Sequence, residues 1–255
     1  MPGEFYRWVR PWERDRGPKH QVTVLECAGP ISCVDMQRLT LGKMRNPVRG
    51  FLHGGAALAS VFGLWLLLTR AWNRPAALAG AFVFGIALLF MYTVSSLYHS
   101  VPWSERWKQR LQKLDHSMIY VVVAGTFTPI AIAALNGLAL WVGLSLVWVL
   151  AIAGILLKAL LPGVRTGLSI TLQLTMGWLA VIWIPQIYRE LGFWAVALIA
   201  LGGLCYTVGV VIFSIKRPRL FPHAFSYHEV FHVFVVAGSS FHFVAILVYA
   251  IPATA

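Results

Sequence analysis

The sequence has few charged residues and even fewer acidic ones. Only 12% of its 255 residues are charged and only nine are Asp or Glu, whereas an average soluble domain is about 25% charged. This scarcity excludes an intrinsically disordered chain and a typical soluble enzyme. Three cysteines are too few for a disulfide scaffold and match no zinc-finger spacing, although a pair between Cys27 and Cys33 stays open.

Long apolar runs take the place of charge. Hydrophobic residues make up 58% of the chain and the mean hydropathy is +0.71. A membrane helix needs about 20 apolar residues to cross about 30 Å of hydrocarbon, and barrel strands would be shorter and would alternate in polarity. The run between Asp115 and Lys158 is long enough for two helices, divided by the turn signal Asn136-Gly137. The sequence therefore predicts an all-α integral membrane protein, a seven-transmembrane helix bundle with spans near 51–69, 77–100, 115–135, 139–160, 167–188, 192–214 and 224–250.

The basic residues are distributed unevenly between the two sides of this bundle. Eighteen of the 21 Lys and Arg residues fall before the first span or in the second, fourth and sixth loops, and three (Arg70, Arg74 and Arg189) fall on the other side. By the positive-inside rule the N-terminus is cytoplasmic and the C-terminus is outside. We therefore expect a multi-pass protein of the cytoplasmic membrane whose basic face meets anionic headgroups, with no nucleic-acid partner. A polar, basic segment (1–45) precedes the seven-helix domain (46–255).

Polar residues from three predicted spans converge at one depth. Ser95 and His99 end the second span, Asp115 lies in the first turn of the third, and His228 and His232 lie in the first two turns of the seventh. All of these ends are cytoplasmic in the predicted topology. Ionisable side chains inside membrane helices are costly, so their default interpretation is functional.

The spacing of the histidines indicates a metal site. His228 and His232 are four residues apart and project from one helical face. With His99 they form a three-histidine set, which leaves a fourth position open for water, as in catalytic zinc sites. Asp115 can hold that water or accept its proton, and Ser95 can orient His99 or donate to a developing oxyanion. The competing interpretation is that buried histidines bond backbone carbonyls across the bundle.

Four other residues near these spans have open roles. Glu229, between His228 and His232, is either the general base of a zinc-protease pattern or an interfacial carboxylate near Lys216 and Arg217. His242 lies about 15 Å beyond His232 along the helix axis, so we expect a packed, hydrogen-bonded histidine there. The other two are His116, which we expect to face the headgroups, and His53, which we expect near the site by depth only.

At these residues the sequence resembles the progestin and adiponectin receptor family, in particular its bacterial hemolysin III branch. The matching stretches are 46–53, 95–99, 114–120, 124–129 and 228–232, followed by Gly238 and His242-Phe243. The resemblance covers about residues 45–250. It implies seven helices, a cytoplasmic N-terminus and zinc held by His99, His228 and His232, with the family's aspartate at Asp115 and its serine at Ser95.

Several functions fit this resemblance. Relatives include ceramide-cleaving lipid amidases, so the first hypothesis is a zinc hydrolase of lipid amides or esters that have long acyl chains. The second is a pore-forming or membrane-perturbing protein with structural zinc, which the crowding of polar residues at one end disfavours. An intramembrane metalloprotease is disfavoured, because that class needs a second aspartate motif and Leu114-Asp115-His116 does not match it. A receptor or membrane-homeostasis sensor would share the same fold, and the sequence leaves the oligomeric state open.

Overall fold

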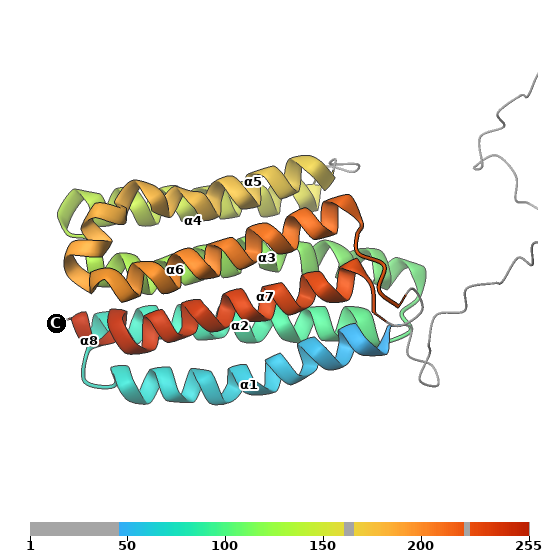
Figure 1. The fold of residues 1–255 in the computed structure, drawn as a ribbon, viewed down its shortest axis with the longest axis horizontal. Coiled ribbons are helices and arrows are strands. Elements are labelled where there is room, and N and C mark those ends of the chain that lie inside the picture. Colours follow the sequence, from blue (N-terminus) through green and yellow to red (C-terminus); the bar gives the residue numbers. More distant parts are fainter. Residues whose placement is uncertain (1–45, 161–165, 222–224, 255) are drawn as a thin grey trace, which may run out of the picture. The chain divides into compact units, whose positions relative to one another are not determined.

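A computed structural model describes residues 46–160, 166–221 and 225–254. In these ranges the regular structure is helical apart from an isolated bridge between Phe221 and Phe225 (Figure 1). The predicted all-α class is confirmed for this part of the chain. The helices are α1 (Pro47–Ala71), α2 (Pro75–Ser100), α3 (Glu105–Ala134), α4 (Gly137–Leu160), α5 (Thr166–Trp178), the 3-10 turn η1 (Leu179–Trp183), α6 (Ile184–Ile215), α7 (Tyr227–Ala245), the π turn η2 (Ile246–Ala250) and α8 (Ile251–Ala253).

Within the described ranges, six helical segments are long and apolar enough to cross a membrane. Five of them correspond to predicted spans one to four and seven. The sixth, Gly167–Ile215, is a 49-residue helical run that includes η1 and contains a break at Gly192, where φ is +80°. The ribbon of this run doubles back between the labels α5 and α6 in Figure 1, and the break at Gly192 lies inside α6. The fifth and sixth predicted spans therefore appear as one nearly continuous run that folds back on itself.

Local chemistry explains where the helices begin. Pro47 and Pro75 occupy the first turns of α1 and α2, where a missing N–H costs nothing. Ser226 and Glu229 form a reciprocal capping box at the start of α7, which satisfies backbone N–H groups that have no helical partner. Gly137, with φ of +52°, separates α3 from α4 at the predicted Asn-Gly turn.

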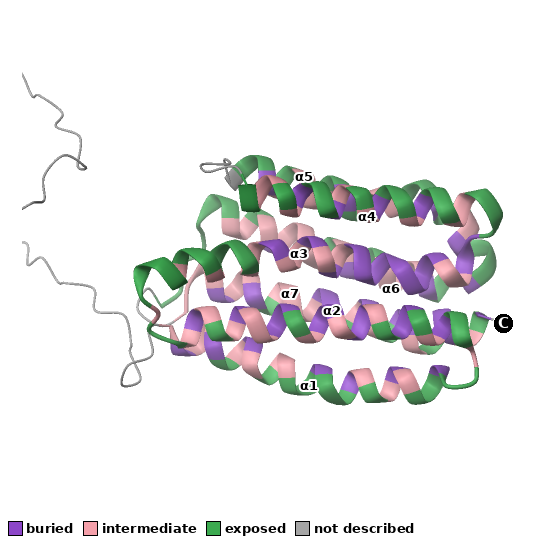
Figure 2. Ribbon diagram, turned by 180° about the vertical axis from the view of Figure 1, so that it is seen from behind, coloured by how far each residue is buried: buried purple, intermediate pink, exposed green. Residues whose placement is uncertain are grey.

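The helices differ strongly in burial. Within an apolar 18-residue stretch of each helix, 67% of the residues are buried in α3 and 50% in α2. The corresponding values are 11% in α1 and 22% in α4. Figure 2 shows the purple, buried positions concentrated on the central helices. Large hydrophobic side chains such as Trp65, Trp141 and Trp194 point outward and are exposed. An outer surface covered by large apolar side chains is expected where hydrocarbon, and not water, surrounds the protein.

One predicted boundary is wrong by about ten residues. The third span was expected to begin at Asp115, whereas α3 begins at Glu105. The first ten residues of α3 are rich in charge and were assigned to a loop because only uncharged runs were counted. Asp115 consequently lies in the third turn of the helix and not in the first. The polar segment 1–45 and the Cys27–Cys33 pair lie outside the described residues.

Candidate metal centre

The polar residues singled out in the sequence gather at one end of the bundle. At this end, here called the proximal end, α1, α3 and α7 begin and α2 ends (Figure 1). His99 lies in the last turn of α2 and Ser95 one turn earlier. His228 and His232 lie in the first two turns of α7, as predicted. All four side chains are buried or half-buried.

The three histidines form a compact cluster. Each offers one ring nitrogen, and these atoms lie within 4.8 Å of one another. The ring centroids are 5.2 Å apart for His99 and His228, 5.1 Å for His99 and His232, and 4.9 Å for His228 and His232. Neutral imidazoles in such an arrangement are the usual ligands of zinc and other late first-row metals. The cluster can therefore hold a metal ion.

Asp115 and Ser95 lie beside this cluster. The Ser95 hydroxyl lies near the Asp115 carboxyl, so α2 and α3 each contribute one member of the pair. Both residues line the same cavity as the three histidines, and its volume is about 420 Å³. The structure thus brings together all five residues that the sequence selected. Their proximity allows a metal, a carboxylate and a hydroxyl to act on one ligand.

The cavity continues away from the histidines along an apolar wall. Its lining includes Phe127 of α3, Met176 of α5, Val196 of α6 and Val235 of α7. Its volume is within the usual range of small-molecule sites. His242 also lines it, ten residues beyond His232 and so about 15 Å farther along the axis. The cavity is therefore long, with its most polar residues near the proximal end.

Two histidines outside the cluster behave differently from one another. His242 Nε2 lies 3.1 Å from the carbonyl of Ile199, which confirms the expectation of a packed, hydrogen-bonded residue. His116 was expected to face the headgroups, but it lines the cavity. The backbone carbonyl of His116 also accepts a hydrogen bond of 3.2 Å from the Gln173 side chain of α5. His116 is therefore a residue of the cavity wall.

His53 was expected near the site by depth only, and that expectation is wrong. Its ring stacks on His232 with centroids 3.9 Å apart and planes inclined by 22°. It is 3% exposed and meets Tyr92 of α2 edge-on at 5.1 Å. The signal that could have found it is the stretch Asn46 to His53, which belongs to the family resemblance. Spacing could not reveal it, because α1 carries no second histidine.

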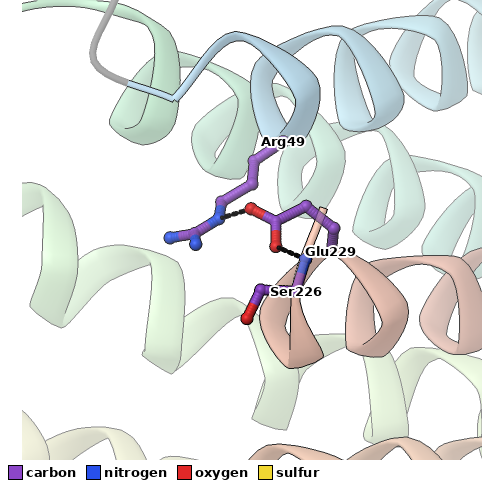
Figure 3. A network of polar contacts seen from close by, with 3 residues as sticks. All are labelled: Arg49, Ser226 and Glu229. Carbon is purple, nitrogen blue, oxygen red and sulfur yellow. Dashed lines mark hydrogen bonds and ion pairs between the residues drawn. The ribbon is translucent and has the colours of Figure 1, made fainter. Parts of the chain in front are cut away.

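Glu229 does not line the cavity but contacts Arg49 and Ser226 at the start of α7 (Figure 3). Arg49 Nε donates to Glu229 Oε1 over 2.6 Å, and the Ser226 backbone N–H donates to Oε2 over 2.8 Å. Both carboxylate oxygens are thus engaged, and Glu229 is not among the residues that line the cavity. The structure favours the interfacial interpretation over the general base. The basic partner is Arg49, however, and not Lys216 or Arg217.

Comparison with known proteins identifies the family of the chain. The family model described as "Haemolysin-III related" matches residues 42–243, which is most of the chain and includes every residue of the cluster. The chain belongs to the haemolysin III family. This confirms the resemblance found in the sequence, because the progestin and adiponectin receptor family includes the hemolysin III proteins.

Individual relatives extend from bacteria to mammals. A hemolysin-3 homolog of Bacillus subtilis (strain 168) is 34% identical over 201 residues, which is 78% of this chain and 91% of that protein. Hemolysin-3 of Bacillus cereus is 30% identical over 219 residues, covering 85% and 97%. The monocyte to macrophage differentiation factor of Homo sapiens is 27% identical over 180 residues, covering 66% and 69%. The haemolysin III family and the apolar helices together indicate a multi-pass membrane protein.

The Arg49–Glu229 pair yields a prediction about stability. The two side chains are only 12% and 7% exposed, so removing one leaves the other poorly solvated. Replacing each with Ala, singly and together, should give a coupling free energy of about 0.5–3 kcal/mol. The measurement is a double-mutant cycle on thermal unfolding of the purified protein in detergent.

The exposed pair Lys108–Glu105, at 3.6 Å, supplies the control. Replacing Lys108 with Ala should change the free energy of unfolding by no more than about 0.5 kcal/mol. Additive effects at Arg49 and Glu229 would mean that the pair does not tie α1 to α7.

Proposed function

We propose that this haemolysin III protein is a zinc-dependent hydrolase of lipid amide or ester bonds in the cell membrane. The observation that carries the proposal is a single cavity lined by the three-histidine cluster, by Asp115 and Ser95, and by a long apolar wall. A site that cleaves a polar bond in a molecule with acyl chains needs both parts. The lipid bilayer would deliver such a substrate directly to a cavity between the helices.

The residues present fit a zinc ion. Zinc is bound by imidazole nitrogens at about 2.0–2.1 Å, and nitrogens within 4.8 Å of one another reach that geometry by small side-chain rotations. His232 Nδ1 is buried without a hydrogen-bond partner, and an unsatisfied buried group costs about 1–3 kcal/mol. A bound ion would offset that cost. His99, His228 and His232 are the proposed ligands, with the fourth position facing the cavity.

The remaining residues divide the chemistry between them. Zinc would supply Lewis-acid activation of water and of a carbonyl oxygen. Asp115 would accept the proton of the attacking water and later donate it to the leaving amine or alcohol. Ser95 would hold the Asp115 carboxyl in place or donate to the oxygen on which negative charge develops. The apolar wall would bind the acyl chain and keep bulk water away.

We further propose seven crossings, with the N-terminus and the basic proximal end in the cytoplasm. The 49-residue run Gly167–Ile215 is about twice the length that one crossing needs, and its break at Gly192 supports two passes. Anionic headgroups would then contact the proximal end. Alkaline phosphatase fused after Ala255 should be active and green fluorescent protein there should be dark, while a fusion within the α4–α5 connection should give the opposite pattern. Fluorescence at the C-terminus would contradict the seventh crossing.

Metal content tests the ligand assignment. The purified wild-type chain should hold about one zinc per molecule, and His228→Ala should lose most of it because two imidazoles bind far more weakly than three. His116→Ala is the matched control, since His116 lines the cavity but lies outside the cluster. Elemental analysis of the detergent-purified proteins gives the ratio. Equal zinc in wild type and His228→Ala would refute the site.

Turnover tests the hydrolase. Asp115→Asn should retain zinc and lose about 10²–10⁴-fold in rate, the usual contribution of one general acid–base group. Release of fatty acid from ceramide-like amides and from acyl esters is the measurement, with Lys108→Ala, at an exposed residue that does not line the cavity, as the control. Absence of turnover by zinc-loaded wild type across such lipids would overturn the enzymatic proposal. Liposome leakage that survives His232→Ala would support the pore-forming alternative instead.

A further inference from the structure

Two residues of α1 face α7 one helical turn apart. Arg49 and His53 are four residues apart and therefore share a face of α1. Arg49 pairs with Glu229, and His53 stacks on His232, which is three residues after Glu229. Because α1 and α7 both begin at the proximal end (Figure 1), the two contacts follow each other in the same order on both helices. The ion pair thus sets the register that brings the rings together.

No hydrogen bond among the described residues fixes the orientation of the His232 ring. Histidines that bind metals usually donate their second ring nitrogen to a carboxylate, a carbonyl or water, which fixes the ring. Among the described residues, no hydrogen bond reaches the His232 ring, so whichever nitrogen bound a metal, the other would have no hydrogen-bond partner to fix the ring. The flat contact with His53, at 3.9 Å and 22°, restricts rotation of the ring where a hydrogen bond would normally do so.

His53 is itself held in place from the other side. Tyr92 meets its ring edge-on at 5.1 Å and an inclination of 77°, and both aromatic residues are buried. The start of α1 is also fastened to α2 by a hydrogen bond of 2.9 Å from the Ser96 hydroxyl to the Gly50 carbonyl. His53 therefore presents a fixed surface to His232. Neither ring nitrogen of His53 has a hydrogen-bond partner. The stack on His232 is therefore the principal interaction of His53 with α7.

We infer that His53 is a positioning residue of the metal centre, whose stacked ring holds His232 in the orientation in which it faces His99 and His228. His53 is not part of the set whose ligand atoms lie within 4.8 Å of one another, so it acts through His232 and not as a ligand. The inference rests on the proposed metal binding by that set. It adds a contribution from α1, which none of the three proposed ligands provides.

Two substitutions separate ring contact from other effects. His53→Phe keeps a flat ring against His232, whereas His53→Leu keeps an apolar side chain of similar size without the ring. Both remove the ring nitrogens, so any difference between them reports stacking. His242→Ala is the matched control for loss of a buried histidine, because the His242 ring contacts Tyr206 and the Ile199 carbonyl rather than the cluster.

The experiment measures zinc affinity of the full-length protein in detergent, after metal removal, by competition with a chromophoric chelator. His53→Leu should weaken binding by about 10–100-fold, as loss of other supporting contacts around metal ligands does. His53→Phe should restore most of that affinity, and His242→Ala should bind as wild type does. The absorption spectrum of bound Co²⁺, which reports ligand geometry, should change in His53→Leu and stay close to wild type in His53→Phe.

Each other outcome is decisive. Equal zinc affinity and equal cobalt spectra in His53→Leu and wild type would overturn the inference, as would equally weakened binding in the Leu and Phe variants. If His53→Leu fails to fold, His53→Phe alone decides, because weakened binding in a folded Phe variant would show that the ring nitrogens matter instead. Failure of wild type to bind zinc would refute the proposed function itself, which is a separate result.

Discussion

The cost of polar groups inside an apolar bundle is the constraint on which the rest of this structure depends. An imidazole or carboxylate surrounded by hydrocarbon must find a partner, because neither water nor lipid chains can supply one. In the described residues most such groups lie together at the proximal end, where they contact one another. The Arg49–Glu229 pair is one solution, which uses opposite charges. A metal ion held by the three histidines, whose ring nitrogens lie within 4.8 Å of one another, would be a second.

The two solutions are also connected mechanically. Glu229 caps α7 through Ser226 and binds Arg49 of α1. His228, one residue before it, and His232, three residues after it, contact His99 instead. The sequence His-Glu-x-x-His therefore serves two faces of one helix turn. Its histidines face the cavity and its glutamate faces α1. The His-Glu-x-x-His pattern is also known from soluble zinc proteases, where the glutamate is a general base. In this protein Glu229 stabilises the start of α7 instead.

The shape of the cavity links the fold to the proposed chemistry. Its apolar wall comes from α3, α5, α6 and α7, and its most polar residues lie at the end where α2 and α7 bring their histidines together. Bond cleavage at the polar end, with the acyl chain held along the wall, is the proposed function, and it would make use of both parts of the cavity. The family relationship indicates a multi-pass membrane protein, while the proposed substrate would depend on the details of that wall.

Much of this was determined by the sequence alone. Apolar runs of helical length fixed the class, and the spacing of His228 and His232 placed two imidazoles on one face, because both features depend only on local periodicity. The choice of His99, Asp115 and Ser95 followed from assigning helix ends to one side. The tertiary structure decided the rest. The true start of α3 was hidden by its charged first turns, whereas the break at Gly192 agrees with the predicted boundary between the fifth and sixth spans. The contacts of His53 with His232 and of Arg49 with Glu229 join residues about 180 positions apart. Only the register between α1 and α7 brings such residues together, and that register comes from packing between helices and not from any local pattern.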